Sequence, residues 1–347
     1  MLKVEKLGVI LEATAHDFES AGVLNPAVIQ EGENVKMLYR AFKDGNFSTI
    51  GYCEFDGPIK LKSRHDIPVI IPEKNYEIHG VEDPRIVKID GVYYITYTGY
   101  DGKNALGCLA TSKDLQHFEK HGIITPSASL NSYKIALDNN RSIFPKYFEH
   151  LQTYIDRGLI HKTKYKVWDK DVVLFPEKID GHFMMIHRLL PGMQWVKFKS
   201  FSDLDKAFWK DYLFHLNQYI LMDPLFDFEN MHIGAGAPPL KTKEGWLLIN
   251  HSVQSTPKGR NYHATVALLD LKDPTKVTHR LNTPLFSPDQ FYEKVGYVNN
   301  VCFPSGTSLF DDDLYVYYGA ADNTIAVARM QLSELLEHLL KFPCNDH

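Results

Sequence analysis

Short runs of β-branched and aromatic residues recur along the chain, and each follows another short apolar run. A stretch rich in Gly, Asp or Asn separates the two members of each pair, which is the signature of a β-hairpin. The aromatic-rich second members are residues 35–42, 92–98, 182–188, 245–252 and 314–320. A third apolar stretch follows most pairs. The pattern therefore predicts a repeated antiparallel unit of at least three strands.

Five such units can be counted along the 347 residues. They begin near Asn25, Glu82, Lys170, Gly234 and Asn299. Repetition at intervals of roughly 60 residues predicts an all-β fold, a five-bladed β-propeller in which each blade is a small antiparallel sheet. A two-sheet sandwich is the alternative. Because all-β folds often exceed the usual domain size, we expect residues 1–347 to form a single catalytic domain.

Three segments depart from the strand pattern. Residues 127–168 form a long, partly helical insertion between blades two and three, with helical spacing that ends at Gly158. Such an insertion is either a lid over the site or a surface for another subunit, so a homo-oligomer stays open. Residues 203–222 also have a helical pattern. The C-terminal segment 330–347 predicts a short amphipathic helix that packs as a cap.

Composition excludes several classes of protein. The net charge is −5, so no basic surface for nucleic acid is expected. No apolar run is long enough to span a membrane, and the N-terminus does not resemble a signal peptide. The four cysteines lack a CxxC pair, which favours reduced thiols and a cytoplasmic location, with the periplasm as the alternative. The 16 histidines include no HxH or HExxH pair, so no metal site is predicted.

Polar residues stand immediately before the opening strand of every unit, in the stretches LNPAVI, VEDPRIV, DKDVVLF, HIGAGAPPL and VNNVCFP. Each one alone is explained by turn chemistry. Together, converging on one axis, they predict a concave polar pocket. In the second stretch Glu82, Asp83 and Arg85 crowd three charges around a proline. This is either an exposed ion pair or a carboxylate beside a guanidinium, suited to an acid and a sugar clamp.

The segment HGVEDPRIVKIDG resembles the signature of glycoside hydrolase family 130, which contains β-mannoside phosphorylases and β-mannosidases. Further stretches follow the family in order, namely LNPAVIQEGENVKMLYR, DVVLFPEKIDGHF, HIGAGAPPLKTKEGWLLINHSV, ALLDLKDPTKV and VNNVCFPSG. The resemblance covers most of residues 20–330 and misses mainly the insertion. It implies a five-bladed β-propeller, an oligosaccharide substrate and no cofactor, with inorganic phosphate as co-substrate in the phosphorylases.

The resemblance also implies roles for individual residues. Asp83 stands at the position of the family's catalytic acid, which acts on the glycosidic oxygen through the sugar's own 3-hydroxyl. The positions expected to bind substrate are Asn25, Arg40, Glu82, Arg85, Lys178, Arg188, His232, His251 and Asp322.

The attacking group is predicted from charge, because phosphate needs cationic donors whereas water needs a carboxylate base. Compared with the phosphorylase pattern, this chain carries Lys170–Asp171 for Arg-Asn, His232 for Lys and Gln254 for a basic residue. These exchanges remove about two positive charges, each worth roughly 1.5–3 kcal/mol in a charge-assisted bond. They favour hydrolysis, with Glu229 as the first candidate for the general base and Asp171 as the second.

Three functions from different classes follow. The favoured one is an inverting glycoside hydrolase that cleaves β-mannosides with water, β-1,2 linkages foremost. The first alternative is a β-mannoside phosphorylase that releases mannose 1-phosphate. The second alternative is a non-catalytic sugar-binding propeller. The intact VEDPR motif argues against the last, because a buried carboxylate without a role is costly to maintain.

Overall fold

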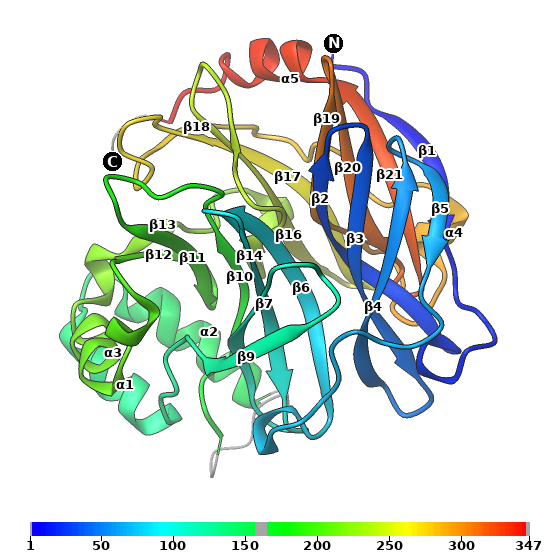
Figure 1. The fold of residues 1–347 in the computed structure, drawn as a ribbon. Helices are drawn as coiled ribbons and strands as arrows, with labels where there is room; N and C mark the ends of the chain where they lie inside the picture. Colours follow the sequence, from blue (N-terminus) through cyan, green and yellow to red (C-terminus); the bar gives the residue numbers. More distant parts are fainter. Residues whose placement is uncertain (1, 157–164, 345–347) are drawn as a thin grey trace.

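The structure is a computed structural model that describes residues 2–156 and 165–344. Its strands form five antiparallel units that follow the chain (Figure 1), and single parallel pairings, Ser48 with Gly80 and Leu106 with Asp169, join the first three units into one twelve-stranded sheet. The first unit contains β2 (Gly22–Glu31), β3 (Asn34–Lys43), β4 (Phe47–Asp56) and β5 (Lys60–Arg64). The second contains β6 (Gly80–Ile89), β7 (Val92–Tyr100), β8 (Ala105–Ser112) and β9 (Phe118–Ile123). The third contains β10 (Asp169–Leu174), β11 (Phe183–Leu189), β12 (Met193–Phe198) and β13 (Ile220–Met222).

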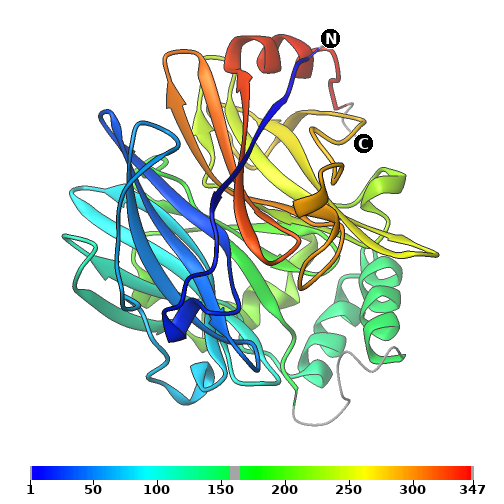
Figure 2. The same cartoon turned by 90° about the vertical axis from the view of Figure 1, so that its right-hand side faces the viewer.

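The last two units differ from the others at their edges. The fourth contains β14 (His232–Ala235), β15 (Leu240–Lys241), β16 (Trp246–Thr256), β17 (Gly259–Leu269) and β18 (Val277–Arg280). The fifth contains β19 (Cys302–Phe310), β20 (Asp313–Ala320) and β21 (Thr324–Gln331), and it is completed by β1 (Glu5–Leu11). Figure 2 shows β1, in blue, running antiparallel beside β21. The sequence pattern did not predict this closure, nor the outermost strands of the other units.

The first strand of each unit lies on the inside of the molecule. Strand β2 packs between β6 and β19, and β10 packs between β6 and β14. Hollows lie at the two ends of these inner strands, with volumes of about 270 and 380 Å³. The predicted all-β class is confirmed, and the five predicted unit starts agree with the observed strands.

Three inner strands carry a β-bulge at their beginning, where the pairing register shifts. The bulged residues are Asn25 in β2, Asp83 in β6 and Asp171 in β10, with φ of 49°, 51° and 55°. Left-handed backbone is tolerated better by Asn and Asp than by other non-glycine residues, and a bulge re-aims a side chain. The same local device therefore directs three polar side chains toward one end of the inner strands.

Four of the five units each contain a buried ion pair of the same kind, here called a clasp, which joins the two edges of that unit. In each clasp a glutamate from a short helix before the inner strand pairs, at 2.7 Å, with a cation from the outermost strand. The pairs are Glu19–Arg64, Glu77–Lys120, Glu229–Arg280 and Glu293–Lys6. The four glutamates are 0–2% exposed. Because each clasp joins the inner and outer edges of a unit, it fixes the start of the inner strand.

The insertion is helical as predicted, with α1 (Leu130–Asn139) and α2 (Phe144–Asp156). Its predicted end at Gly158 lies outside the described residues. Helix α3 (Lys206–Phe214) falls in the second predicted helical segment and packs against α1 on the flank of the third unit (Figure 1). Two further helices are α4 (Phe291–Lys294) and the C-terminal α5 (Leu332–Leu339), which confirms the predicted cap. None of the helices in the described ranges is both long and apolar enough to cross a bilayer.

Candidate functional site

The 270 Å³ hollow lies at the end of the inner strands where the bulged residues gather. Its floor is charged and its rim is aromatic. The floor is contributed by Arg40, Glu82, Lys170 and Asp322, and the rim by Phe42, Tyr100, Trp168 and Tyr297. These residues come from the first, second, third and fifth units. Of the floor residues, Arg40, Glu82 and Asp322 were predicted to bind substrate, whereas Lys170 was predicted only to replace a phosphate-binding residue and the rim aromatics were given no role.

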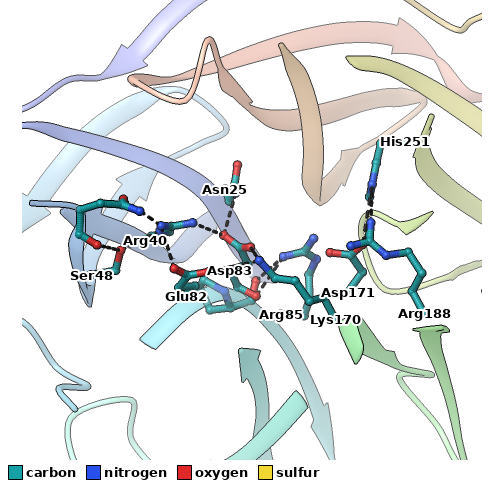
Figure 3. Close-up of polar contacts among 12 residues, drawn as sticks. Asn25, Arg40, Ser48, Glu82, Asp83, Arg85, Lys170, Asp171, Arg188 and His251 are labelled. Carbon is teal, nitrogen blue, oxygen red and sulfur yellow. Dashed lines mark hydrogen bonds and ion pairs between the residues drawn. The ribbon is translucent and has the colours of Figure 1, made fainter. Parts of the chain in front are cut away.

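Asp83 is the centre of the polar network beneath this hollow (Figure 3). Its Oδ1 accepts a hydrogen bond of 2.7 Å from Asn25 Nδ2 and one of 3.3 Å from Arg40 Nη1, and its Oδ2 lies 3.5 Å from Lys170 Nζ. Burial acts to raise the pKa of Asp83, but the charges of Lys170 and Arg40 outweigh it and hold the pKa well below the usual range. Glu82 shares the same two cations, at 2.9 Å from Arg40 and 3.2 Å from Lys170.

Asp322 lies in the tight turn between β20 and β21, with φ of 49°. It faces the same hollow from the fifth unit. Desolvation raises its pKa to about 6, against the opposing charge of Arg40 and with the help of Asp83. The site thus holds two carboxyl groups whose pKa values are displaced in opposite directions, which is a recurrent property of catalytic sites.

A second cluster, formed by Asp171, Arg188 and His251, lies beside the first (Figure 3). Arg188 Nη1 is 2.6 Å from Asp171 Oδ2 and 3.3 Å from His251 Nε2. The side chains of Asp171 and His251 pack against Gly234, where a Cβ atom would lie 2.4 Å from Asp171 Oδ2 and 2.5 Å from the His251 ring. The first glycine of the HIGAGAPPL stretch is therefore required by the site itself.

Two histidines at this cluster are neutral. Burial, reinforced by the charges of Arg188 and Arg85, lowers the pKa of His251 to about 3 despite Asp171. Burial and the neighbouring Arg188 hold the pKa of His232 well below its usual value. The His232 ring meets the His251 ring edge-on, with centroids 6.3 Å apart. Both rings are hydrogen-bonding groups rather than charges at neutral pH.

Most hydrogen bonds of the Arg85 side chain go to backbone carbonyl groups of the protein itself. Its side chain donates to the backbone carbonyls of Asp83, Pro84 and Gly236, and its guanidinium lies over the Phe303 ring at 5.5 Å. These contacts tie the second unit to the fourth and fifth, and Arg85 is only 1% exposed. The sequence prediction of direct sugar binding is not tested by this placement.

Several buried polar atoms at the site have no hydrogen-bond partner among the described residues. They are Asn25 Oδ1, Arg85 Nη2, Asp171 Oδ2, Arg188 Nε and His251 Nδ1. Of these, Asp171 Oδ2 is compensated by its ion pair with Arg188. Arg188 Nη1 can only donate to His251 Nε2, so the proton of the neutral ring is on Nδ1. Three of the five atoms are therefore donors, and one of the two acceptors, Asp171 Oδ2, already faces a cation. Because buried polar groups are normally paired, this arrangement fits a ligand that supplies acceptors.

Arg260 is a cation that sequence reasoning missed. It stands opposite Ser255 in the β16–β17 pairing, its side chain hydrogen-bonds Tyr262, and its charge contributes to the low pKa of His232. Gln254, which occupies the position predicted for a lost basic residue, faces His263 at 3.4 Å instead. Because β16 and β17 pair, Arg260 lies near Gln254, the position at which the sequence comparison found no positive charge.

The structure corrects the prediction for Lys178. Its Nζ pairs with Asp90 at 2.8 Å, and both side chains are solvent-exposed. Lys178 follows the C-terminal end of β10, whereas the candidate site lies at the N-terminal end of that strand. It therefore belongs to the opposite end of the unit and not to the predicted pocket.

The structure also corrects the prediction that Glu229 is the general base. Glu229 is the carboxylate of the fourth clasp, where both oxygens accept from Arg280 at 2.7 Å. Its Oε2 also accepts from the backbone N–H groups of Leu225 and Phe226. A carboxylate fully engaged in this way, and repeated in three other units, has a structural role. The second candidate, Asp171, does lie at the site.

Comparison with known proteins agrees with this geometry. The sequence model of a family described as Glyco_hydro_130, beta-1,4-mannooligosaccharide phosphorylase, matches residues 11–341. The chain is 34% identical to a 1,2-beta-oligomannan phosphorylase of Thermoanaerobacter sp. (strain X514), over 96% of this chain and 99% of that protein. It is 35% identical to a beta-1,2-mannobiose phosphorylase of the same organism, over 90% and 91% of the two chains.

A solved structure has the same fold. The beta-1,2-mannobiose phosphorylase of Listeria innocua, in complex with beta-1,2-mannobiose, superposes with a TM-score of 0.71 at 21% identity, covering 97% of this chain and 99% of that one. The matched residues span every unit of strands described above. The family predicted from the sequence is thereby confirmed, and the chain belongs to glycoside hydrolase family 130.

Proposed function

We propose that this protein is a β-mannoside phosphorylase that acts on β-1,2-linked mannosides, and that its five units are the blades of a propeller with the active site on the axis. The observation that carries the proposal is the donor-rich cluster around Arg188. Buried N–H groups of Arg85, Arg188 and His251 lack acceptors, and a phosphate dianion supplies several. Relatives that match nearly the whole chain are phosphorylases of β-1,2-linked mannosides.

The sequence favours hydrolysis only if Asp171 presents an uncompensated negative charge to phosphate. In the structure Arg188 neutralises that charge at 2.6 Å. Arg260, which the comparison of motifs did not count, adds a cation close to His232. The guanidinium groups of Arg85, Arg188 and Arg260 act here together with the carboxylates of Asp171 and Asp83, so cations outnumber anions three to two. Such a balance favours an anion as the attacking group.

Hydrolysis would require a carboxylate free to deprotonate water. Of the two predicted candidates, Glu229 is held in a clasp by Arg280. Asp171 is bound by Arg188 and is 4% exposed. Neither carboxylate is available as a base in this arrangement, which supports phosphate rather than water as the nucleophile.

In the proposed reaction a phosphate oxygen held by Arg188 and His251 attacks the anomeric carbon. The glycosidic C–O bond breaks, the leaving oxygen takes a proton that originates from Asp83, and the product is mannose 1-phosphate of inverted configuration. The resemblance to the family implies that the sugar's 3-hydroxyl relays this proton. Because Lys170 and Arg40 hold Asp83 ionised before substrate binds, the bound substrate must raise its pKa for this step.

The deciding experiment is product analysis with β-1,2-mannobiose in the presence and absence of inorganic phosphate. The proposal expects mannose 1-phosphate and mannose in equal amounts, formed only when phosphate is present. Equal release of mannose in both reactions would establish a hydrolase instead. Lack of any product with β-1,2- and β-1,4-linked substrates, together with retained sugar binding, would favour the non-catalytic alternative.

A further inference from the structure

The helical insertion reaches the candidate phosphate side of the site through one residue of α2. Tyr154 is 5% exposed, and its hydroxyl lies 3.1 Å from His232 Nδ1. The preceding turn of the same helix carries His150, whose ring meets His232 edge-on at 6.3 Å. The insertion, which the proposed reaction does not otherwise use, therefore touches a site residue directly.

Helix α2 is held rigidly where it makes this contact. Tyr147, two turns before Tyr154, donates to Asp223 Oδ1 at 2.8 Å and accepts from Gln194 Nε2 at 3.0 Å. Tyr147, Leu151 and Tyr154 all pack into the hydrophobic core of the third unit. The position of the Tyr154 hydroxyl is consequently set by the fold rather than by a loop.

His232 needs such a contact because its neutral ring has two tautomers. Burial lowers the pKa of His232, and the nearby charge of Arg188, the rings of His251 and His150 and the charge of Arg260 lower it further, so a second proton is disfavoured. If Nδ1 accepts from the Tyr154 hydroxyl, the single ring proton is on Nε2. An Nε2–H group is a donor for an anion, whereas a bare Nε2 would repel one.

We propose that Tyr154 is a positioning residue that selects the Nε2-protonated tautomer of His232, so that His232 donates to the phosphate oxygens together with Arg188. This inference rests on the proposed phosphorylase function. It gives the insertion a role in orienting the nucleophile, in place of the lid or subunit surface that its sequence suggested.

The test compares Tyr154→Phe with Tyr133→Phe. Tyr133 lies on α1 of the same insertion, and its buried hydroxyl has no hydrogen-bond partner among the described residues, so its loss is a matched control. For Tyr154→Phe we expect the KM for phosphate to rise by roughly three- to tenfold, as for loss of one hydrogen bond. The KM for mannobiose and the melting temperature should equal those of the control.

A spectroscopic measurement tests the tautomer directly. Histidine ¹⁵N NMR of the wild type, assigned with a His232→Gln variant, should show a protonated Nε2 and an unprotonated Nδ1. Tyr154→Phe should show both tautomers. A wild-type His232 protonated on Nδ1, or a Tyr154→Phe variant with an unchanged phosphate KM, would overturn the inference.

Failure of the proposed function would look different. A wild type that releases mannose without phosphate would refute phosphorolysis, whatever the His232 tautomer. Should Tyr154→Phe fail to fold, the tautomer of the wild-type enzyme alone still decides the inference.

Discussion

Arg188 Nη1 lies 2.6 Å from Asp171 Oδ2, and the two side chains are 10% and 2% exposed. The pair joins adjacent strands, β10 and β11, at the start of the third unit. Because both charges are buried, removal of one partner leaves the other without compensation in a poorly solvated site. This contact changes what the Lys170–Asp171 pair predicts about phosphate binding. Asp171 positions the Arg188 guanidinium and does not present a free negative charge to phosphate.

The pair predicts a specific response to mutation. Arg188→Gln should lower kcat/KM for phosphate by on the order of 10²-fold, because a charged donor is lost and Asp171 is left unpaired. The double variant Arg188→Gln/Asp171→Asn should recover part of this loss, since the unpaired charge is also gone. Steady-state kinetics at variable phosphate measure both effects. Strictly additive losses in the double variant would show that the pair is not coupled.

Asp83→Asn should remove catalysis and keep the fold. The amide has the shape of the carboxyl group but cannot supply the proton, so kcat should fall by about 10²- to 10⁴-fold. Asp90→Asn is the matched control, because Asp90 sits in an exposed pair with Lys178 and its loss should leave kcat unchanged. The measurement is initial rate at saturating phosphate and mannobiose. A variant with more than about a tenth of wild-type activity would exclude Asp83 as the acid.

Asp322 should give the enzyme an acidic limb in its pH profile. Desolvation raises the pKa of Asp322 to about 6, so the carboxylate that would accept from sugar hydroxyls is lost as the pH falls below that value. For one required ionisation, kcat/KM for mannobiose should fall about tenfold per pH unit below pH 6. In Asp322→Asn this limb should disappear and the remaining activity should be low and flat. A limb that persists unchanged in the variant would assign it to another group.

Asp322 should make the free energy of unfolding fall as the pH rises, whereas an acid with a lowered pKa in an ion pair makes it rise. Because the pKa of Asp322 in the folded state lies above the unfolded value near 3.8, the native protein binds more protons between those two values. Its contribution to the free energy of unfolding therefore decreases as the pH rises from about 4 to 6 and is constant above that range. Urea unfolding of wild type and Asp322→Asn across this range should give a difference in the free energy of unfolding that changes with this slope. A parallel pH dependence in the two proteins would contradict this assignment.

The sequence predicts the units and the location of Asp83 at the site well, because both depend on local patterns. Strand alternation and turn residues are local, and Asn25, Asp83 and Asp171 precede the apolar runs of their strands in a recognisable way. Contacts between distant strands were not predictable. Arg260 reaches the site only through the β16–β17 pairing, and β1 closes the fifth unit from the other end of the chain.

Glu229 shows why a polar residue before an inner strand is an ambiguous signal. It lies near the start of β14, as Asp83 lies near the start of β6. However, Asp83 occupies a bulge inside the strand, whereas Glu229 ends a short helix ahead of it. The repeat of clasp glutamates at Glu19, Glu77 and Glu293 was present in the sequence as an aromatic residue followed by Glu, a signal that only comparison among the units could reveal.

The variant Glu229→Gln distinguishes a structural role of Glu229 in its clasp from a role as the catalytic base. The variant leaves Arg280 buried without its counter-charge, so the free energy of unfolding should fall by about 3–5 kcal/mol, while kcat below the unfolding temperature stays near that of the wild type. Glu177→Gln is the control, because the Glu177–Lys241 pair is exposed and its loss should change stability by less than about 1 kcal/mol. Urea unfolding and initial rates measure the two quantities independently. If Glu229 were the base, kcat would instead fall by about 10²- to 10⁴-fold with little change in stability, and the clasp interpretation would have to be abandoned.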